Sequence, residues 1–341
     1  MYNPNLVFGI SYLIALVAAA PLSTGNDFLA AVTATDTGPL LAIQTAAHGS
    51  LSNIAPPAAL VGGKDSLTNF QLVNFNENME VAFFNQLIHN ISTNTHGFTF
   101  KQFTNDTNAI IQPCKYDFPV TNFKEAIATA SLFTDVTMGT LGDIQTNFGT
   151  NGDSKFIRGV AASLGQEGEQ NGYFRLILNK IPSALPFLTA STRDFAFSAV
   201  NQNFVIEGSC PNSNTIPLKK LQKLTATQPD TINANSTIKF TFQLNPTQSY
   251  TNTWGDKCKG LSLVYINQQN KPVVQQWESI SLQADQKTVI ATAKFQFDAG
   301  AAKGAPGNGL TLAALAVGDD FANISEVSDK AVFGPALIEV N

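Results

Sequence analysis

The sequence predicts a multidomain α+β protein, in which an antiparallel four-helix bundle is followed by a β-sandwich of the immunoglobulin-like type. The chain has 341 residues, enough for two domains of ordinary size. Between residues 67 and 210, apolar side chains recur at the spacing typical of amphipathic helices. After residue 224 the apolar period changes to two, which is typical of strands with one buried face. The chain is therefore expected to have a helical part and a β-rich part.

The first twenty residues are expected to be a secretory signal, not a part of the fold. The run from Leu6 to Ala20 is apolar, ends in small residues and is too short to span a bilayer. A buried N-terminal helix is the alternative interpretation. Residues 21–66 contain short helical patterns broken by prolines, and we interpret them as a lead-in segment that packs on the bundle.

The first helix of the bundle is predicted over residues 67–91, and its apolar stripe contains two glutamates. Glu77 and Glu80 fall on the same helical face as Phe70 and Phe84. A carboxylate inside a core is unfavourable unless it is hydrogen-bonded, paired, protonated or bound to a metal. The stripe therefore predicts a buried acidic site.

Three more helices are predicted over about residues 121–148, 154–179 and 191–206, with connections short enough for an antiparallel bundle. Each helix carries polar side chains in the middle of its apolar stripe. These inward polar residues are Thr134 and Thr137 on the second helix, Glu167 and Gln170 on the third, and Gln202 on the fourth. If the helices pack side by side, these groups meet the two glutamates of the first helix in one layer of the core.

The β-rich part is predicted over residues 230–341, after a linker at 211–229. Ile238, Phe240 and Phe242 alternate with polar residues, as expected for a strand with one buried face. Roughly seven short strands separated by turn residues indicate a sandwich of two sheets.

Composition and short motifs indicate an exported protein. Charged residues are only 13% of the chain and the net charge is −5, without a basic run, which argues against nucleic acid and anionic membranes as partners. No integral membrane segment is expected in the mature chain. Glycosylation sequons occur at Asn90, Asn105, Asn235 and Asn323. In an oxidising compartment two of the three cysteines are expected to pair, and the sequence leaves open which of Cys114, Cys210 and Cys258 they are.

Three motifs resemble one known family. They are LTNFQLVNFNENMEVAFFNQL, GQEGEQNGYFR and LPFLTASTRDFAFSAVNQNFV, and they are similar to the secreted ferritin-like proteins of fungi of the late sexual development or stress-response family. The resemblance covers residues 28–210 and implies a ferritin-like bundle. It places Glu77 or Glu80 at the glutamate of the first ferritin helix and Glu167 at that of the third. Thr134 and Thr137 stand where a Glu-x-x-His pair would be, so the implied di-metal site is degenerate.

These observations favour a secreted, non-catalytic protein with a structural or interaction role at the cell wall, in development or stress. No cofactor is expected, and the partner would be a cell-wall polysaccharide or an extracellular protein. One alternative is a metal-binding protein or metal-dependent oxidoreductase in which Glu77, Glu80 and Glu167 bind Mn, Mg, Ca or Fe. The other alternative is carbohydrate binding by the β-domain, and the aromatic residues that would stack on sugars are Trp254, Trp277 and Tyr250.

Overall fold

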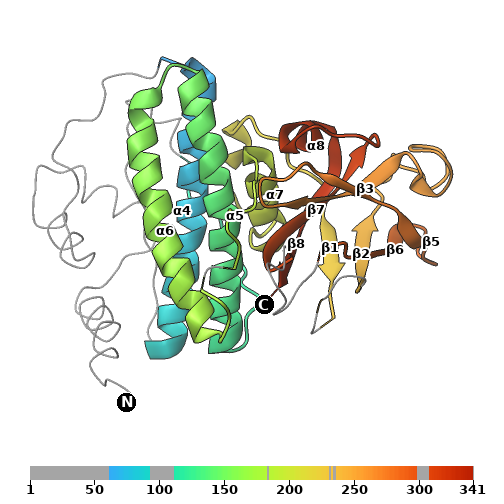
Figure 1. Ribbon diagram of the computed structural model, residues 1–341, viewed down its shortest axis with the longest axis horizontal. Helices are drawn as coiled ribbons and strands as arrows, with labels where there is room; N and C mark the ends of the chain where they lie inside the picture. The colour runs from blue at the N-terminus through green and yellow to red at the C-terminus, as the bar shows by residue number, and fades with distance from the viewer. Residues whose placement is uncertain are drawn as a thin grey trace, which may run out of the picture. The chain divides into compact units, whose positions relative to one another are not determined.

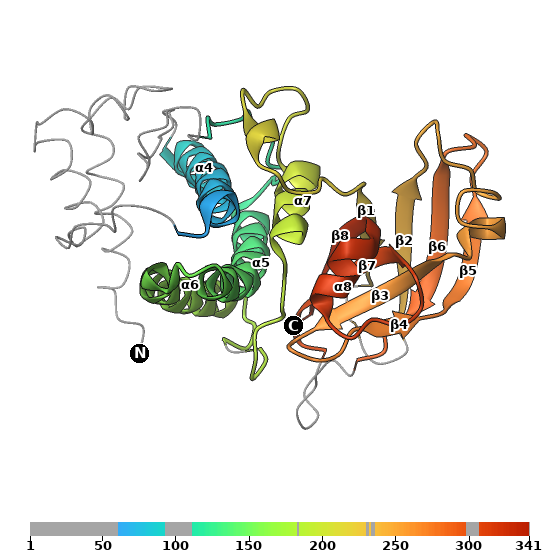
Figure 2. The same ribbon diagram turned by 90° about the horizontal axis from the view of Figure 1, so that it is seen from above.

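A computed structural model describes residues 61–92, 111–182, 184–229, 232, 236–297 and 307–340 (Figures 1 and 2). The expected signal segment, most of the lead-in segment, and the sequons at Asn105 and Asn235 lie outside these residues, as does the side chain of Asn90. The chain divides into two compact units, each of which is described by itself. The first contains residues 1–118 and 204–217, and the second contains residues 119–203 and 218–341.

The first unit is organised around helix α4 (Gly63–Ser92). Leu72, Phe75 and Met79 recur on its buried side. The side chain of Asn74 accepts a hydrogen bond from the Ile111 N–H at 3.1 Å, and the Asn78 amide donates to the Ile111 carbonyl at 3.1 Å. Two polar side chains of α4 therefore bind the backbone of the segment that begins at residue 111.

That segment is also joined to residues 204–217 within the first unit. A disulfide links Cys114 to Cys210 across a sequence separation of 96 residues. The Asp117 N–H donates to the Phe204 carbonyl at 2.8 Å, beside an antiparallel bridge between Tyr116 and Val205. Covalent and backbone bonds thus hold together two segments that are far apart in the sequence.

The second unit contains helices α5 (Phe123–Thr150), α6 (Ile157–Ile177), α7 (Arg193–Asn203) and α8 (Ile324–Lys330). Helix α5 begins where the Asn122 side chain accepts a hydrogen bond from the Glu125 N–H at 3.0 Å, a standard N-cap. Helix α5 packs against α6 and α7, and α7 also contacts strand β8 (Ala331–Val340). None of the described helices is long and apolar enough to cross a membrane.

The strands of the second unit form two antiparallel sheets of four strands each. The first sheet has the order β1-β2-β6-β5, with bounds Leu224–Thr227, Thr237–Gln243, Thr288–Lys294 and Trp277–Leu282. The second has the order β4-β3-β7-β8, with β4 at Val273–Gln275, β3 at Leu261–Asn267 and β7 at Gly309–Val317. Strand β1 therefore begins inside the segment 211–229 that the sequence indicates as a linker.

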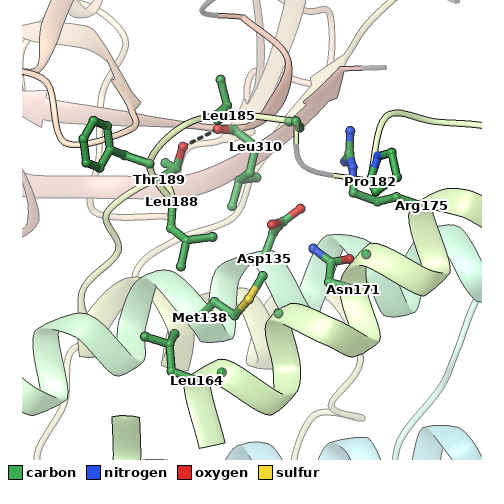
Figure 3. Close-up of a pocket in the computed structure, with 16 residues that line it drawn as sticks. Asp135, Met138, Leu164, Asn171, Arg175, Pro182, Leu185, Leu188, Thr189 and Leu310 are labelled. Atoms are coloured by element: carbon green, nitrogen blue, oxygen red, sulfur yellow. Dashed lines mark hydrogen bonds between the residues drawn. The ribbon is translucent and has the colours of Figure 1, made fainter. Parts of the chain in front are cut away.

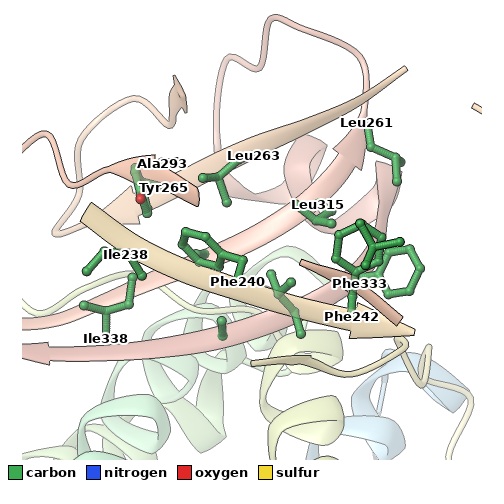
Figure 4. Packing of buried hydrophobic residues seen from close by; sticks show 14 of the residues in the cluster. Ile238, Phe240, Phe242, Leu261, Leu263, Tyr265, Ala293, Leu315, Phe333 and Ile338 are labelled. Carbon is green, nitrogen blue, oxygen red and sulfur yellow. The ribbon is translucent and has the colours of Figure 1, made fainter. Parts of the chain in front are cut away.

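Side chains from both sheets form one apolar core (Figure 4). Phe240 and Phe242 of β2 meet Tyr265 of β3 and Phe333 of β8, and the ring centroids of Phe242 and Phe333 are 4.7 Å apart. Strand β7 is buried at every position from Gly309 to Ala316, so both of its faces are covered. This explains why its sequence is apolar apart from Thr311, since an apolar residue is favoured on each covered face.

The predicted fold class is wrong. The described residues show no four-helix bundle, because α7 is only 11 residues long and packs on strand β8 as well as on α5. The second unit combines α5, α6 and α7 with two small antiparallel sheets, which makes the protein a mixed α/β structure with a long β-rich C-terminal region. Neither the ferritin-like nor the immunoglobulin-like classification holds for this arrangement. The physical reason is that an amphipathic period indicates a buried face without indicating what covers that face.

Candidate functional site

The carboxylates predicted from the sequence are divided between the two units. Glu77 and Glu80 are half-buried on α4 in the first unit, and burial raises the pKa of Glu77 above its usual range. Glu167 is half-buried on α6 in the second unit. Within the described residues, no three His, Cys, Asp or Glu side chains are grouped so that they could hold a metal ion. A site for Mn, Mg, Ca or Fe on these glutamates stays a prediction.

The predicted polar residues on α5 and α6 have different surroundings. Thr134 and Thr137 are buried on α5. Gln170, expected to point inward, is exposed, and the next residue on α6, Asn171, is buried instead. The Asn171 side chain accepts a hydrogen bond from the Ser131 hydroxyl of α5 at 2.6 Å. At this point of α6 the buried position is therefore one residue later than the apolar period indicates, whereas Leu164 and Phe174 of the same stripe are half-buried.

Gln202, on α7, binds the backbone of the β-rich region. Its side-chain amide donates to the carbonyls of Leu221 at 2.9 Å and Gly334 at 2.7 Å. Gly334 belongs to strand β8, so this glutamine fixes the helix to the sheet. We assign it a structural role because its donors are used in these bonds.

The structure describes the environment of all three cysteines and of the sequon at Asn323. Cys114 and Cys210 form the disulfide, whereas Cys258 is buried with a free thiol. Asn323 is exposed and caps α8, because its side-chain oxygen accepts a hydrogen bond from the Glu326 N–H at 3.1 Å. Its amide nitrogen is the atom that glycosylation would modify. Glycosylation at Asn323 stays a prediction.

The aromatic residues considered for sugar stacking pack against the apolar core. The Trp277 ring lies 5.9 Å from Phe240, and the Trp254 ring lies 5.8 Å from Phe333, measured between ring centroids. The Tyr250 hydroxyl donates to a backbone carbonyl at 3.1 Å. All three residues are half-buried, so part of each ring serves the core.

A candidate site is a cavity of about 230 Å³ within the second unit (Figure 3). Its walls come from α5, α6, the segment that follows α6, and the start of β7. Most of the lining is apolar, and the largest of these side chains belong to Met138, Leu164, Leu185, Phe187, Leu188 and Leu310. Asp135, Asn171 and Arg175 are the groups that bring charge or amide chemistry to it. Apolar side chains around a few convergent polar groups make this cavity a candidate for a small-molecule site.

Glycines on α6 keep the cavity open. Gly165, Gly168 and Gly172 line it at helical spacing. A Cβ added at Gly165 would meet no atom within 4 Å, and one added at Gly168 would meet only the Met138 sulfur at 3.9 Å. The space beside this helix is therefore available because these positions lack side chains, not because the backbone forces glycine there.

One wall of the cavity contains a buried ion pair. Arg175, only 2% exposed, donates from Nη1 to Oε1 of Glu339 and from Nε to the Ile181 carbonyl at 2.6 Å. The ammonium group of Lys180 lies 3.6 Å from the same Glu339 oxygen. Burial raises the pKa of Glu339, and the charges of Lys180 and Arg175 act in the opposite direction. Glu339 is paired across the sheet with Leu310, which places this ion pair beside the cavity.

Asp135 is the carboxyl group that lines the cavity itself. Burial, followed by the negative charge of Glu339, raises its pKa to about 7, although Arg175 and the Asn171 hydrogen bond act to lower it. No Lys or Arg among the described residues forms a salt bridge with Asp135, because both nearby cations pair with Glu339. The cavity thus contains a carboxyl group that changes charge near neutral pH.

Sequence reasoning missed Asp135, Arg175 and Glu339. The available signal was an isolated charge in an otherwise uncharged stretch. Asp135 is the one charged residue between Glu125 and Asp143, and Glu339 is the one charged residue of strand β8. Because an isolated charge in a buried element needs a partner, such residues are candidates for a shared site.

Comparison with known proteins adds no assignment, because no protein-family model and no curated protein matches the chain. The resemblance to secreted ferritin-like fungal proteins therefore stays a prediction about relationship, and function must be argued from the site.

Proposed function

We propose that this protein is a secreted, non-catalytic binding protein whose cavity takes a small organic molecule. The cavity of about 230 Å³ carries this proposal, because its apolar walls enclose a carboxyl, an amide and a guanidinium group. Expected roles at the cell wall, in development or stress, would then depend on capture of a ligand. The sequons and the paired cysteines support the extracellular setting.

The chemistry of the lining supports binding over catalysis. The described residues that line the cavity include no serine, cysteine or histidine. The one hydroxyl among these described residues, on Thr189, donates to the Leu310 carbonyl at 2.5 Å and accepts from the Gln268 N–H at 2.9 Å. A nucleophilic hydroxyl donates its hydrogen bond to a neighbouring base, whereas this hydroxyl donates to a backbone carbonyl.

The exposed edge of the cavity supports access from solvent. Phe187 lines the cavity and is 64% exposed, and its neighbour Leu188 is 38% exposed. Leu188 is held in place because its carbonyl accepts a hydrogen bond from the Gln269 side chain at 2.9 Å. An apolar rim on an anchored segment is suited to guide the apolar part of a ligand inward.

A fragment screen with a blocked cavity tests this proposal. Binding of a small-fragment library to the full secreted chain would be followed by NMR, in parallel with the Gly168→Leu variant. The leucine side chain should fill the space beside Met138, so fragments that bind the natural chain should lose binding at least tenfold in the variant.

Gly159→Leu is the matched control, since Gly159 is exposed on the same helix, meets no atom within 4 Å and does not line the cavity. It should bind the fragments as the natural chain does. Gly165→Leu repeats the blockade from a second position in case Gly168→Leu fails to fold. The proposal is wrong if no fragment binds, or if both blocking variants bind as well as the control.

A further inference from the structure

The two cations beside the cavity both pair with Glu339, and neither pairs with Asp135. Asp135, on α5, faces Arg175 of α6, Lys180 just after α6, and Glu339 of β8. Arg175 and Lys180 both pair with one oxygen of Glu339, and Asp135 has no ion-pair partner in the part of the chain that the structure describes. The loop residues and the β7 residues that line the cavity carry no charge. Asp135 is thus the carboxyl group that lines the cavity and makes no direct ion pair among the described residues.

The carboxyl group of Asp135 is accessible from the cavity. Its carboxyl group projects from α5 between Asn171 on one side and Met138 on the other (Figure 3). Leu164 and Leu188 form apolar walls farther along, and the glycines of α6 leave room between them. A ligand that fits this shape has an apolar body at one end and a hydrogen-bond donor at the other.

We propose that the cavity selects a small organic cation, in which an ammonium group pairs with Asp135 and an apolar body lies along Gly165 and Gly168. This inference rests on the proposed binding function and specifies its ligand class. An anion is disfavoured because the guanidinium donors nearest the cavity are directed to Glu339 and to the Ile181 carbonyl. The Asp135 carboxyl makes no ion pair among the described residues, and the ammonium group of a ligand would be its direct partner.

The pairing of an ammonium group with Asp135 predicts how the affinity for the ligand changes with pH. An ammonium ligand pairs with the ionised form of Asp135, so the proton must leave that carboxyl group when the ligand binds. With a pKa of about 7, Asp135 is mostly protonated at pH 6 and mostly ionised at pH 8. The affinity should therefore be about tenfold higher at pH 8 than at pH 6. A neutral ligand that accepts a hydrogen bond from the protonated carboxyl would show the opposite trend.

Three probes of nearly equal size test the ligand class on the full secreted chain: benzylamine, benzyl alcohol and benzoate. Calorimetric titrations at pH 6 and pH 8 would measure their affinities for the natural chain, for Asp135→Asn and for Asp143→Asn. Asp143 lies on the same helix, outside the cavity lining, and serves as the charge control. We expect benzylamine to bind most tightly, to bind better at pH 8, and to lose at least tenfold in affinity only in Asp135→Asn.

The outcomes separate this inference from the proposed function. If benzyl alcohol or benzoate binds as tightly as benzylamine, the cavity binds ligands but the cation class is wrong. If benzylamine binds equally well to Asp135→Asn, the ammonium group does not pair with Asp135 and the inference is also wrong. If none of the probes binds while the fragment screen yields ligands, only the cation class fails. If the fragment screen yields none either, both proposals fail.

Discussion

Strand β7 and helix α6 both border the cavity, yet they are held in place by different interactions. In β7 every residue from Gly309 to Ala316 is buried, and its side chains are apolar except for Thr311. In α6 only Asn171 and Arg175 are fully buried. The strand is stabilised by packing on both faces, whereas the helix is fixed by directed polar bonds to Ser131, Ile181 and Glu339. A few polar contacts leave most of one helix face unpacked, which is how space for a ligand can persist beside it.

The largest expected effect comes from breaking the polar attachment of α6. Arg175→Met should destabilise the protein by about 3–4 kcal/mol, because it leaves the buried Glu339 carboxylate with Lys180 as its remaining ion-pair partner. Chemical denaturation of the secreted chain would measure the loss. Adding Glu339→Gln to this variant should recover part of it, since the second change removes the buried charge. A loss that the second change leaves untouched would show that Arg175 stabilises α6 through packing and its hydrogen bond to the Ile181 carbonyl, not through the ion pair.

Glycines on the two elements should respond in opposite directions. Gly309 of β7 has a φ of +72°, and an added Cβ would lie 3.0 Å from the Ala184 Cβ, so Gly309→Ala should destabilise the protein by about 1–2 kcal/mol. Gly165 of α6 faces open space, so Gly165→Ala should stabilise it by about 0.5–1 kcal/mol through helix propensity. Thermal unfolding of both variants would measure the difference. Equal effects would contradict the contrast between a packed strand and a loosely packed helix.

The smallest expected effect is the pH dependence of stability that Asp135 introduces. Its pKa rises from 3.8 to about 7 on folding, so the folded state keeps a proton that the unfolded state has lost between these values. The natural chain should therefore lose stability relative to Asp135→Asn as the pH rises from 5 to 8. The difference should be about 1 kcal/mol, after allowance for solvent screening of this half-buried group. Denaturation curves at the two pH values would measure it, and the same pH dependence in both chains would mean that Asp135 is already ionised in the folded state at pH 5.

The sequence alone determined the local elements well. The helices predicted at 121–148 and 154–179 are observed as Phe123–Thr150 and Ile157–Ile177, because a helical period is set by the chain's own geometry. The alternation of Ile238, Phe240 and Phe242 likewise indicated a strand, and all three residues are buried in the core. The sequence also indicated that some polar side chains lie on buried helix faces, as Thr134 and Thr137 do.

Only the tertiary structure decided what each buried face meets. The apolar period of α6 predicts that Gln170 is buried. In the structure Gln170 is exposed, and Asn171, which accepts the hydrogen bond from Ser131, is buried instead. Gln202 was expected in a bundle core, and it instead binds the strand backbone at Gly334. The charge of Glu339 on β8 raises the pKa of Asp135 on α5, although the two residues are far apart in the sequence. Such contacts between distant residues depend on long-range packing, which local periodicity does not encode. The candidate site is built from contacts of this kind.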